Sequence, residues 1–207
     1  MRKSTHIIAC LFVFVVISVN SVVGQESLAT IKQVASVGGS SGNVAFVTQV
    51  GQNNAVEVMQ QGNSNLVMSQ QSGSSNEFIS NQSGDRNKII NTSIGKANEV
   101  SNVQSGDDNK IIEFTGGRDN KVSIEQQGDN NIASSTTVGS NYDISIKQDG
   151  DNNKVWGLHL GNAQGGADQP TQIIQNGDGN ELYTELNGER VLTIKQRNGA
   201  SASVKQY

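Results

Sequence analysis

A glycine recurs every eleven residues along most of this chain. The series is Gly51, Gly62, Gly73, Gly84, Gly95, Gly106, Gly117, Gly128, Gly139, Gly150 and Gly161, and after an insertion of five residues it resumes at Gly177, Gly188 and Gly199. A constant spacing over so many residues indicates an array of equivalent structural units. The chain is therefore expected to fold as a repeat protein.

Each unit is a turn followed by a strand. Residues 82–87 are a cluster of turn formers, and residues 87–93 run for about the length of a typical strand. Eleven residues cannot hold a helix and its connections. Branched apolar residues alternate with polar ones, as at Val122 and Ile124.

A longer period of 22 residues is superposed on the glycine step. Alternate turns share the pattern Gln-x-Gly-Asp-x-Asn, and these turns begin at Gln82, Gln104, Gln126, Gln148 and Gln175. Two units therefore form one coil. The prediction is an all-β fold, a two-sheet β-solenoid of stacked 22-residue strand-turn-strand-turn coils with cross-β stacking. About seven coils at a strand spacing of about 4.8 Å would make a stack roughly 35 Å long.

The alternation also assigns an inner and an outer face. Asn54, Val56, Val58 and Gln60 share one parity and are expected to point inward. Like residues would then stack on like residues, and their amides could form ladders. Such ladders would compensate for a composition that is only 34% hydrophobic and 4% aromatic. The candidate assembly-ladder residues are Gln49, Asn54, Gln60, Asn65, Gln82, Asn87, Gln104, Asn109, Gln126, Asn131, Gln148 and Asn153.

An aspartate follows the glycine in alternate turns. These residues are Asp85, Asp107, Asp129, Asp151 and Asp178. Stacked, they would form a row of like charges, and three interpretations remain open. The row could be a gatekeeper that slows stacking until the carboxylates are protonated, it could bind calcium, or aspartate could simply suit the turn.

The chain divides into three parts. Residues 1–24 combine a basic start with an apolar run, which predicts a secretory signal peptide. Residues 25–42 form an N-terminal lead-in that is expected to be irregular, and residues 43–207 form the repeat solenoid. Residues 162–171 interrupt the period and are expected to form a loop insertion.

Catalysis is not expected. Outside residues 1–24 the chain contains one histidine, His159, and no cysteine. It has no nucleophile elbow and no phosphate-binding loop, so we expect no enzyme, no catalytic residue, no cofactor and no metal site. A net charge of −4 gives no basic footprint for nucleic acid.

The pattern Gln49-x-Gly51-x-x-Asn54-x-Val56-x-x-x-Gln60 resembles the curlin repeat, and the match recurs to the C-terminus. The resemblance implies a curli-like solenoid that is exported from a bacterium. It implies assembly with itself into curli, the extracellular functional amyloid fibres of biofilm and adhesion. The implied partners are another curlin-type subunit and the outer-membrane secretion and accessory proteins.

Two alternatives to a major fibre subunit remain open. The last coils are irregular and basic, with Arg190, Lys195, Arg197 and Lys205, as expected of a minor curlin-like nucleator at the outer membrane. The second alternative is a monomeric secreted solenoid that acts as an adhesin or binds a polysaccharide. One outer face is also expected to carry an apolar stripe through Met68, Ile90, Ile112, Ser134, Trp156 and Tyr183.

Overall fold

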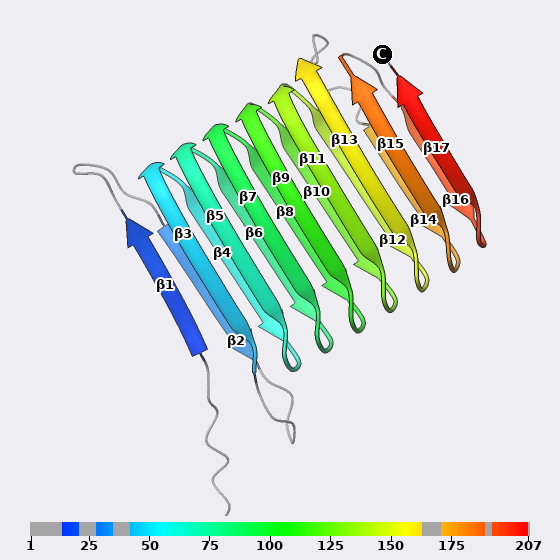
Figure 1. Ribbon diagram of the computed structural model, residues 1–207. Coiled ribbons are helices and arrows are strands. Elements are labelled where there is room, and N and C mark those ends of the chain that lie inside the picture. The colour runs from blue at the N-terminus through cyan, green and yellow to red at the C-terminus, as the bar shows by residue number, and fades with distance from the viewer. Residues whose placement is uncertain (1–13, 21–27, 35–41, 163–170, 189–191, 207) are drawn as a thin grey trace, which may run out of the picture.

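The computed structural model describes residues 14–20, 28–34, 42–162, 171–188 and 192–206. These residues form two β-sheets that lie face to face and contain no helix (Figure 1). The first, sheet A, has nine strands: β1 (Phe14–Asn20), β3 (Val44–Gln52), β5 (Leu66–Ser74), β7 (Lys88–Lys96), β9 (Lys110–Arg118), β11 (Ile132–Ser140), β13 (Lys154–Asn162), β15 (Glu181–Asn187) and β17 (Ser201–Gln206). The second, sheet B, has eight: β2 (Leu28–Val34), β4 (Ala55–Gln61), β6 (Glu77–Ser83), β8 (Glu99–Ser105), β10 (Lys121–Gln127), β12 (Asp143–Asp149), β14 (Thr171–Asn176) and β16 (Thr193–Arg197).

The chain alternates between the two sheets, so one strand of each sheet makes one coil. Each strand before β16 pairs in parallel with the equivalent strand of the next coil, as β7 does with β9. The register is 22 residues over most of the stack, for example Lys88 opposite Lys110. The predicted two-sheet solenoid with a 22-residue coil is confirmed.

The turn glycines explain the eleven-residue step. Gly106 has a φ of 112°, which side chains other than hydrogen rarely allow. A Cβ at this position would lie 2.2 Å from the carbonyl oxygen of Gly128 in the next coil. Both the backbone conformation and the close approach of stacked turns therefore require glycine.

The core is thin and has the expected inner face. Asn54, Val56, Val58 and Gln60 are all at most 2% exposed, while Glu57 between them faces solvent. A continuous apolar strip runs up the stack and includes Phe78, Ile89, Ile111 and Ile144. Buried asparagine and glutamine lie on both sides of this strip, so the core is closed by polar rows.

The N-terminal part differs from the sequence expectation in one respect. The lead-in was expected to be irregular, but residues 28–34 form strand β2, parallel to β4. The reason is that Gln33 falls opposite Gln60, so this segment keeps the repeat register without the turn glycine. Strand β1, inside the segment expected to be a signal peptide, lies along β3.

The predicted loop insertion at 162–171 lies almost entirely outside the described residues. The stack continues past it, because β14 pairs with β12 with Gln175 opposite Gln148. In the described part of the chain, no helix has the length and apolarity needed to cross a membrane.

Candidate assembly interface

Sheet B carries a continuous glutamine ladder. The Nε2 atom of each glutamine donates to the Oε1 atom of the glutamine one coil later, at 2.7–2.9 Å. The ladder runs through Gln60, Gln82, Gln104, Gln126, Gln148, Gln175 and Gln196. Each amide also reaches sheet A, as Gln104 Nε2 does by donating to the carbonyl oxygen of Lys88 at 3.3 Å. The row therefore links successive coils and both sheets.

Sheet A has no matching ladder. Gln49 donates to Gln71 at 3.0 Å, but the same register position is then occupied by Ser93, Thr115, Thr137 and His159. Of the predicted glutamines, Gln49 alone thus belongs to a different row from the other five. The eleven-residue glycine pattern is the same in both sheets, whereas the inward residues of the two sheets differ.

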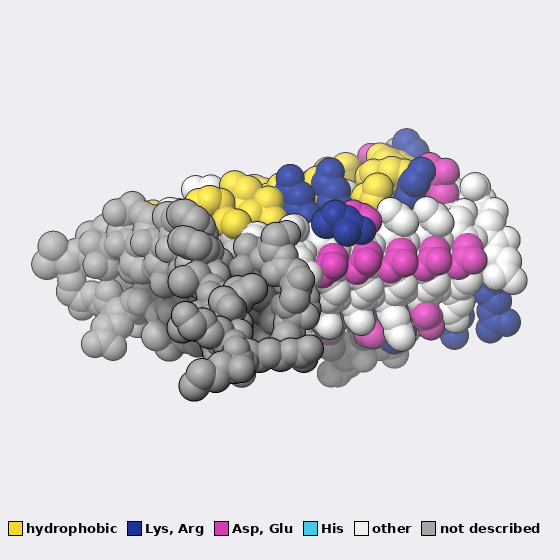
Figure 2. Space-filling model, turned by 90° about the horizontal axis from the view of Figure 1, so that it is seen from below, with side chains coloured by type: hydrophobic (Ala, Val, Ile, Leu, Met, Phe, Trp, Pro, Cys, Tyr) yellow, Lys and Arg dark blue, Asp and Glu magenta, His cyan; other side chains and the backbone are white. Residues whose placement is uncertain are grey.

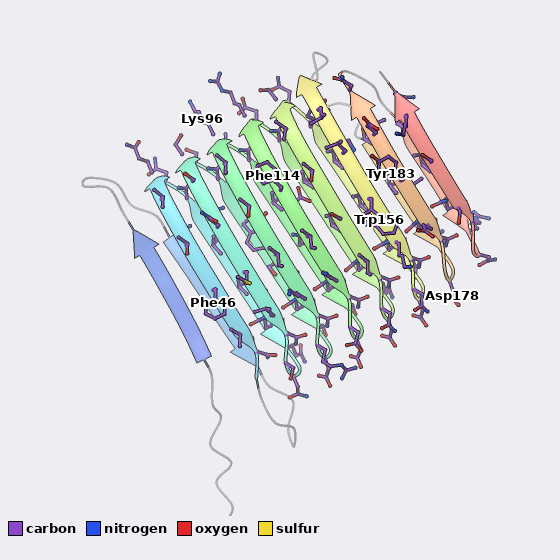
Figure 3. All side chains as sticks on the ribbon, in the orientation of Figure 1. Phe46, Lys96, Phe114, Trp156, Asp178 and Tyr183 are labelled. Atoms are coloured by element: carbon purple, nitrogen blue, oxygen red, sulfur yellow. The ribbon has the colours of Figure 1, made fainter. Side chains whose placement is uncertain are left out.

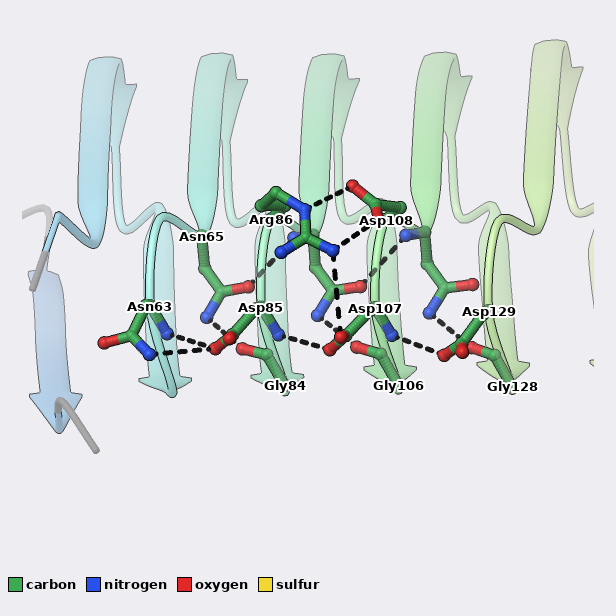
Figure 4. Close-up of polar contacts among 12 residues, drawn as sticks. Asn63, Asn65, Gly84, Asp85, Arg86, Gly106, Asp107, Asp108, Gly128 and Asp129 are labelled. Atoms are coloured by element: carbon green, nitrogen blue, oxygen red, sulfur yellow. Dashed lines mark hydrogen bonds and ion pairs between the residues drawn. The ribbon is translucent and has the colours of Figure 1, made fainter. Parts of the chain in front are cut away.

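The predicted asparagines are all buried at the starts of strands, but they bond mainly to backbone. The Oδ1 atom of Asn65 accepts from the backbone N–H of Asn87 at 3.0 Å, and its Nδ2 atom donates to the carbonyl oxygen of Gly84 at 2.8 Å (Figure 4). Asn87 repeats both contacts with Asn109 and Gly106. The asparagine rows therefore hold the turns of neighbouring coils together through side chain and main chain.

The aspartate row is also a hydrogen-bond ladder. One carboxylate oxygen of each aspartate accepts from the backbone N–H of the turn residue one coil earlier, at 2.8–2.9 Å (Figure 4). Asp85, Asp107, Asp129, Asp151 and Asp178 form one line of negative charge along the turn edge (Figure 2). Among the described residues, no group of acidic, histidine or cysteine side chains is placed to hold a metal ion.

Charged pairs between coils add to the turn edge. Arg86 contacts Asp108 at 2.6 Å and Asp107 at 3.8 Å, and Lys121 contacts Glu99 at 3.1 Å. The hydrogen bond from Arg86 holds the pKa of Asp108 below its usual value. All these groups are exposed, so the pairs contribute little to stability.

Two buried titratable residues were not singled out for their charge state by the sequence. Glu113 is 1% exposed and His159 is fully buried. Burial raises the pKa of Glu113 to about 8 and lowers the pKa of His159 to about 4. Glu113 has the inward parity of Ile111 and Thr115, so the period itself could have identified it.

The apolar stripe lies on the outer face of sheet A, as expected. Three of its members are each about 40% exposed, namely Phe46, Met68 and Tyr183. The strand register aligns the row Met68, Ile90, Ile112, Ser134, Trp156 and Tyr183. Figure 3 places Phe46, Trp156 and Tyr183 along this sheet. The view in Figure 2 shows hydrophobic and basic side chains together beyond the acidic row.

The comparisons with known proteins agree with this geometry. The model of the curlin associated repeat matches residues 117–155, which span β10, β11 and β12 with their turns. No curated protein and no solved structure matches the chain. Residues 117–155 are therefore similar to the curlin associated repeat, and Gly117, Gly128 and Gly139 within them continue the glycine series of the coils before them.

Proposed function

We propose that the protein is the structural subunit of an extracellular curli-type amyloid fibre, which grows by end-to-end stacking of solenoids. The observation that carries this proposal is the continuous parallel pairing of strands, together with the glutamine ladder of sheet B, up to the last coil. Strands β16 and β17 end their sheets, and an end strand offers unpaired backbone groups to another chain. A stacked neighbour would extend the same ladders.

The proposed fibre forms outside the cell, so the protein must first be exported. Residues 1–24 act as a secretory signal and are removed, so that the secreted protein begins at about Gln25. Strand β1 is the end strand of sheet A and pairs with β3. Its removal therefore leaves every later coil intact and makes β3 the first strand of that sheet.

The fibre role is tested directly by purifying residues 25–207 and following thioflavin fluorescence, with and without preformed fibre seeds. We expect unaided polymerisation, faster growth with seeds, and aligned fibres whose diffraction shows the interstrand spacing of about 4.8 Å along the axis. A polypeptide that stays monomeric and soluble in this assay would overturn the fibre role and favour the monomeric adhesin or polysaccharide-binding alternative.

A minor nucleating subunit is favoured by one specific observation. The last strands carry exposed basic residues, including Lys195, Arg197 and Lys205. If the protein is a nucleator, small amounts of it should shorten the lag of another curlin-type subunit. No catalytic step belongs to either role.

The apolar stripe is proposed to bundle fibres laterally. Changing Ile90, Ile112 and Trp156 together to serine should leave fibre growth intact but give thin, separate fibres, because the apolar contact between neighbours is lost. Electron microscopy measures the bundle width. The matched control is Ile79→Ser on the outer face of sheet B, which should keep the bundles. Bundles of normal width in the triple variant would remove the proposal.

A further inference from the structure

The two ends of the solenoid carry the same short strand sequence. Residues 30–33 in β2 and residues 193–196 in β16 both read Thr-Ile-Lys-Gln. Following the strand pairing through sheet B places them on the same rows: Thr30 with Thr193, Ile31 with Ile194, Lys32 with Lys195 and Gln33 with Gln196. The first and last strands of sheet B thus share four consecutive residues in the same register.

The repeat alone does not account for this identity. The row that begins at Thr30 and ends at Thr193 contains Glu57, Ile79 and serines in between. The row from Lys32 to Lys195 passes through Met59, Asn81, Val103, Glu125, Lys147 and Ile174. The glutamine row is uniform along its length and the isoleucine row also contains Ile124, Ile146 and Ile173, whereas threonine stands only at the two ends of its row.

Sheet A shows the same return at its ends. The inward positions of β3 are Ala45, Val47 and Gln49, and the corresponding positions of β17 are Ala202, Val204 and Gln206. Between them the Val47 row changes through Ser69, Asn91 and Glu113. Counted from β3, sheet A therefore ends with the inner residues with which it begins.

The C-terminal end leaves these inner residues uncovered. Ala202 is exposed, and Val204 and Gln206 are half-buried, although equivalent residues inside the stack are buried. A further coil placed on this end would cover them. The coil whose inner residues match in kind is the first coil of a second copy.

We infer that the fibre joint is formed between β16 and β17 of one copy and β2 and β3 of the next, in parallel and in register. This inference rests on the proposed function and names the joint that it requires. Thr193 pairs with Thr30 and Ala202 with Ala45, so the glutamine ladder of sheet B passes from Gln196 to Gln33 of the second copy. In the structure β1 occupies the β3 edge, and the joint forms after that segment is removed.

Cysteine cross-linking of residues 25–207 tests the register. This part of the chain has no cysteine, and positions 30 and 193 lie about seven coils, roughly 35 Å, apart within one copy. In Thr30→Cys/Thr193→Cys fibres the two thiols of a joint come within the reach of a disulfide. Oxidation with diamide should give long covalent multimers after the fibres are dissolved without reductant.

The matched control shifts one cysteine along the same strand. Thr30→Cys/Arg197→Cys moves the second thiol by four residues, about 13 Å, which is beyond disulfide reach. We expect no multimers from it. A second in-register pair on sheet A, Phe46→Cys/Ser203→Cys, should cross-link like the first.

The outcomes separate the joint from the fibre role. Absence of fibres from the cysteine-free chain overturns the proposed function and the joint together. Fibres that cross-link in neither in-register pair, or equally well in the control, overturn the joint and leave the fibre role standing.

Charge reversal gives an independent measurement. Lys32 and Lys195 end a row that passes through exposed Met59, Asn81 and Val103 and then through Glu125, Lys147 and Ile174, so the joint places two lysines next to each other. Lys32→Glu or Lys195→Glu alone should speed seeded growth about two- to fivefold, and the double reversal should return it to the original rate. A double variant in which the two effects simply multiply would contradict the register.

Discussion

Gly106→Ala should be among the most damaging single substitutions in the repeat region. The alanine would have to adopt a φ of 112°. Its Cβ would lie 2.2 Å from the carbonyl oxygen of Gly128 and 2.8 Å from a carboxylate oxygen of Asp129. Strain of this kind costs about 1–3 kcal/mol, and the backbone clash adds a similar amount. We expect a loss of about 3 kcal/mol or more in the free energy of unfolding, measured by urea denaturation and circular dichroism, together with slower fibre growth.

Gly179→Ala is the matched control. Gly179 also has a positive φ, 69°, but nothing lies within 4 Å of a Cβ built there. It should therefore lose only about 1 kcal/mol, the usual cost of a left-handed conformation for alanine. Equal losses in the two variants would show that backbone conformation, and not the stacking of turns, fixes the glycine step.

Glu113 should make the fold less stable as the pH rises above neutrality. Its Oε1 atom accepts from the Thr115 hydroxyl at 2.7 Å, and its Oε2 atom has no partner with hydrogen-bonding geometry among the described residues. The residues on either side of it in the stack are Asn91 and Ser135, which carry no charge. Burial therefore dominates, and the hydroxyl groups of Thr115 and Ser135 offset only part of its effect on the pKa.

The sign follows from the raised pKa. In the folded protein the pKa is about 8, whereas the ordinary value is 4.5, so folding favours the protonated carboxyl group. The contribution of Glu113 to the free energy of unfolding is therefore fully present below pH 4.5 and is lost as the pH rises towards 8. Buried His159 has the opposite effect, because its pKa falls from 6.5 to about 4 and it destabilises the fold only when the pH drops below 6.5. The range from pH 6.5 to 8 therefore isolates Glu113.

Across that range we expect a loss of about 2 kcal/mol in the free energy of unfolding, and a corresponding slowing of assembly. Glu113→Gln keeps the shape and removes the charge, so its unfolding free energy should not vary over the same range. Glu125→Gln is the control, since Glu125 is exposed and pairs with Lys147 at 2.9 Å. It should retain the original pH dependence.

This experiment also separates Glu113 from the aspartate row. Gatekeeping by the row predicts faster assembly at acid pH, and that prediction stands apart from Glu113. If Glu113→Gln leaves the slope between pH 6.5 and 8 unchanged, the buried carboxyl group is not its cause.

The period alone predicted which residues lie inside. Asn54, Val56, Val58 and Gln60 are buried as their parity requires, since successive residues of a strand point to opposite faces. The expected stripe through Ile90 and Trp156 follows from the same arithmetic. The prediction of an irregular lead-in was wrong for residues 28–34, because β2 forms without a turn glycine and its register is fixed by pairing with β4.

The coil, the two sheets and the inner face follow from the repeat, because eleven residues of alternating polarity leave few other ways to bury the apolar side chains. The hydrogen bonding of the polar rows became visible only in the folded protein. It showed a glutamine ladder confined to sheet B, aspartates that accept backbone N–H groups, and a buried carboxyl group at Glu113. These depend on distances and orientations between residues one coil apart, which a pattern of spacings along the chain does not contain.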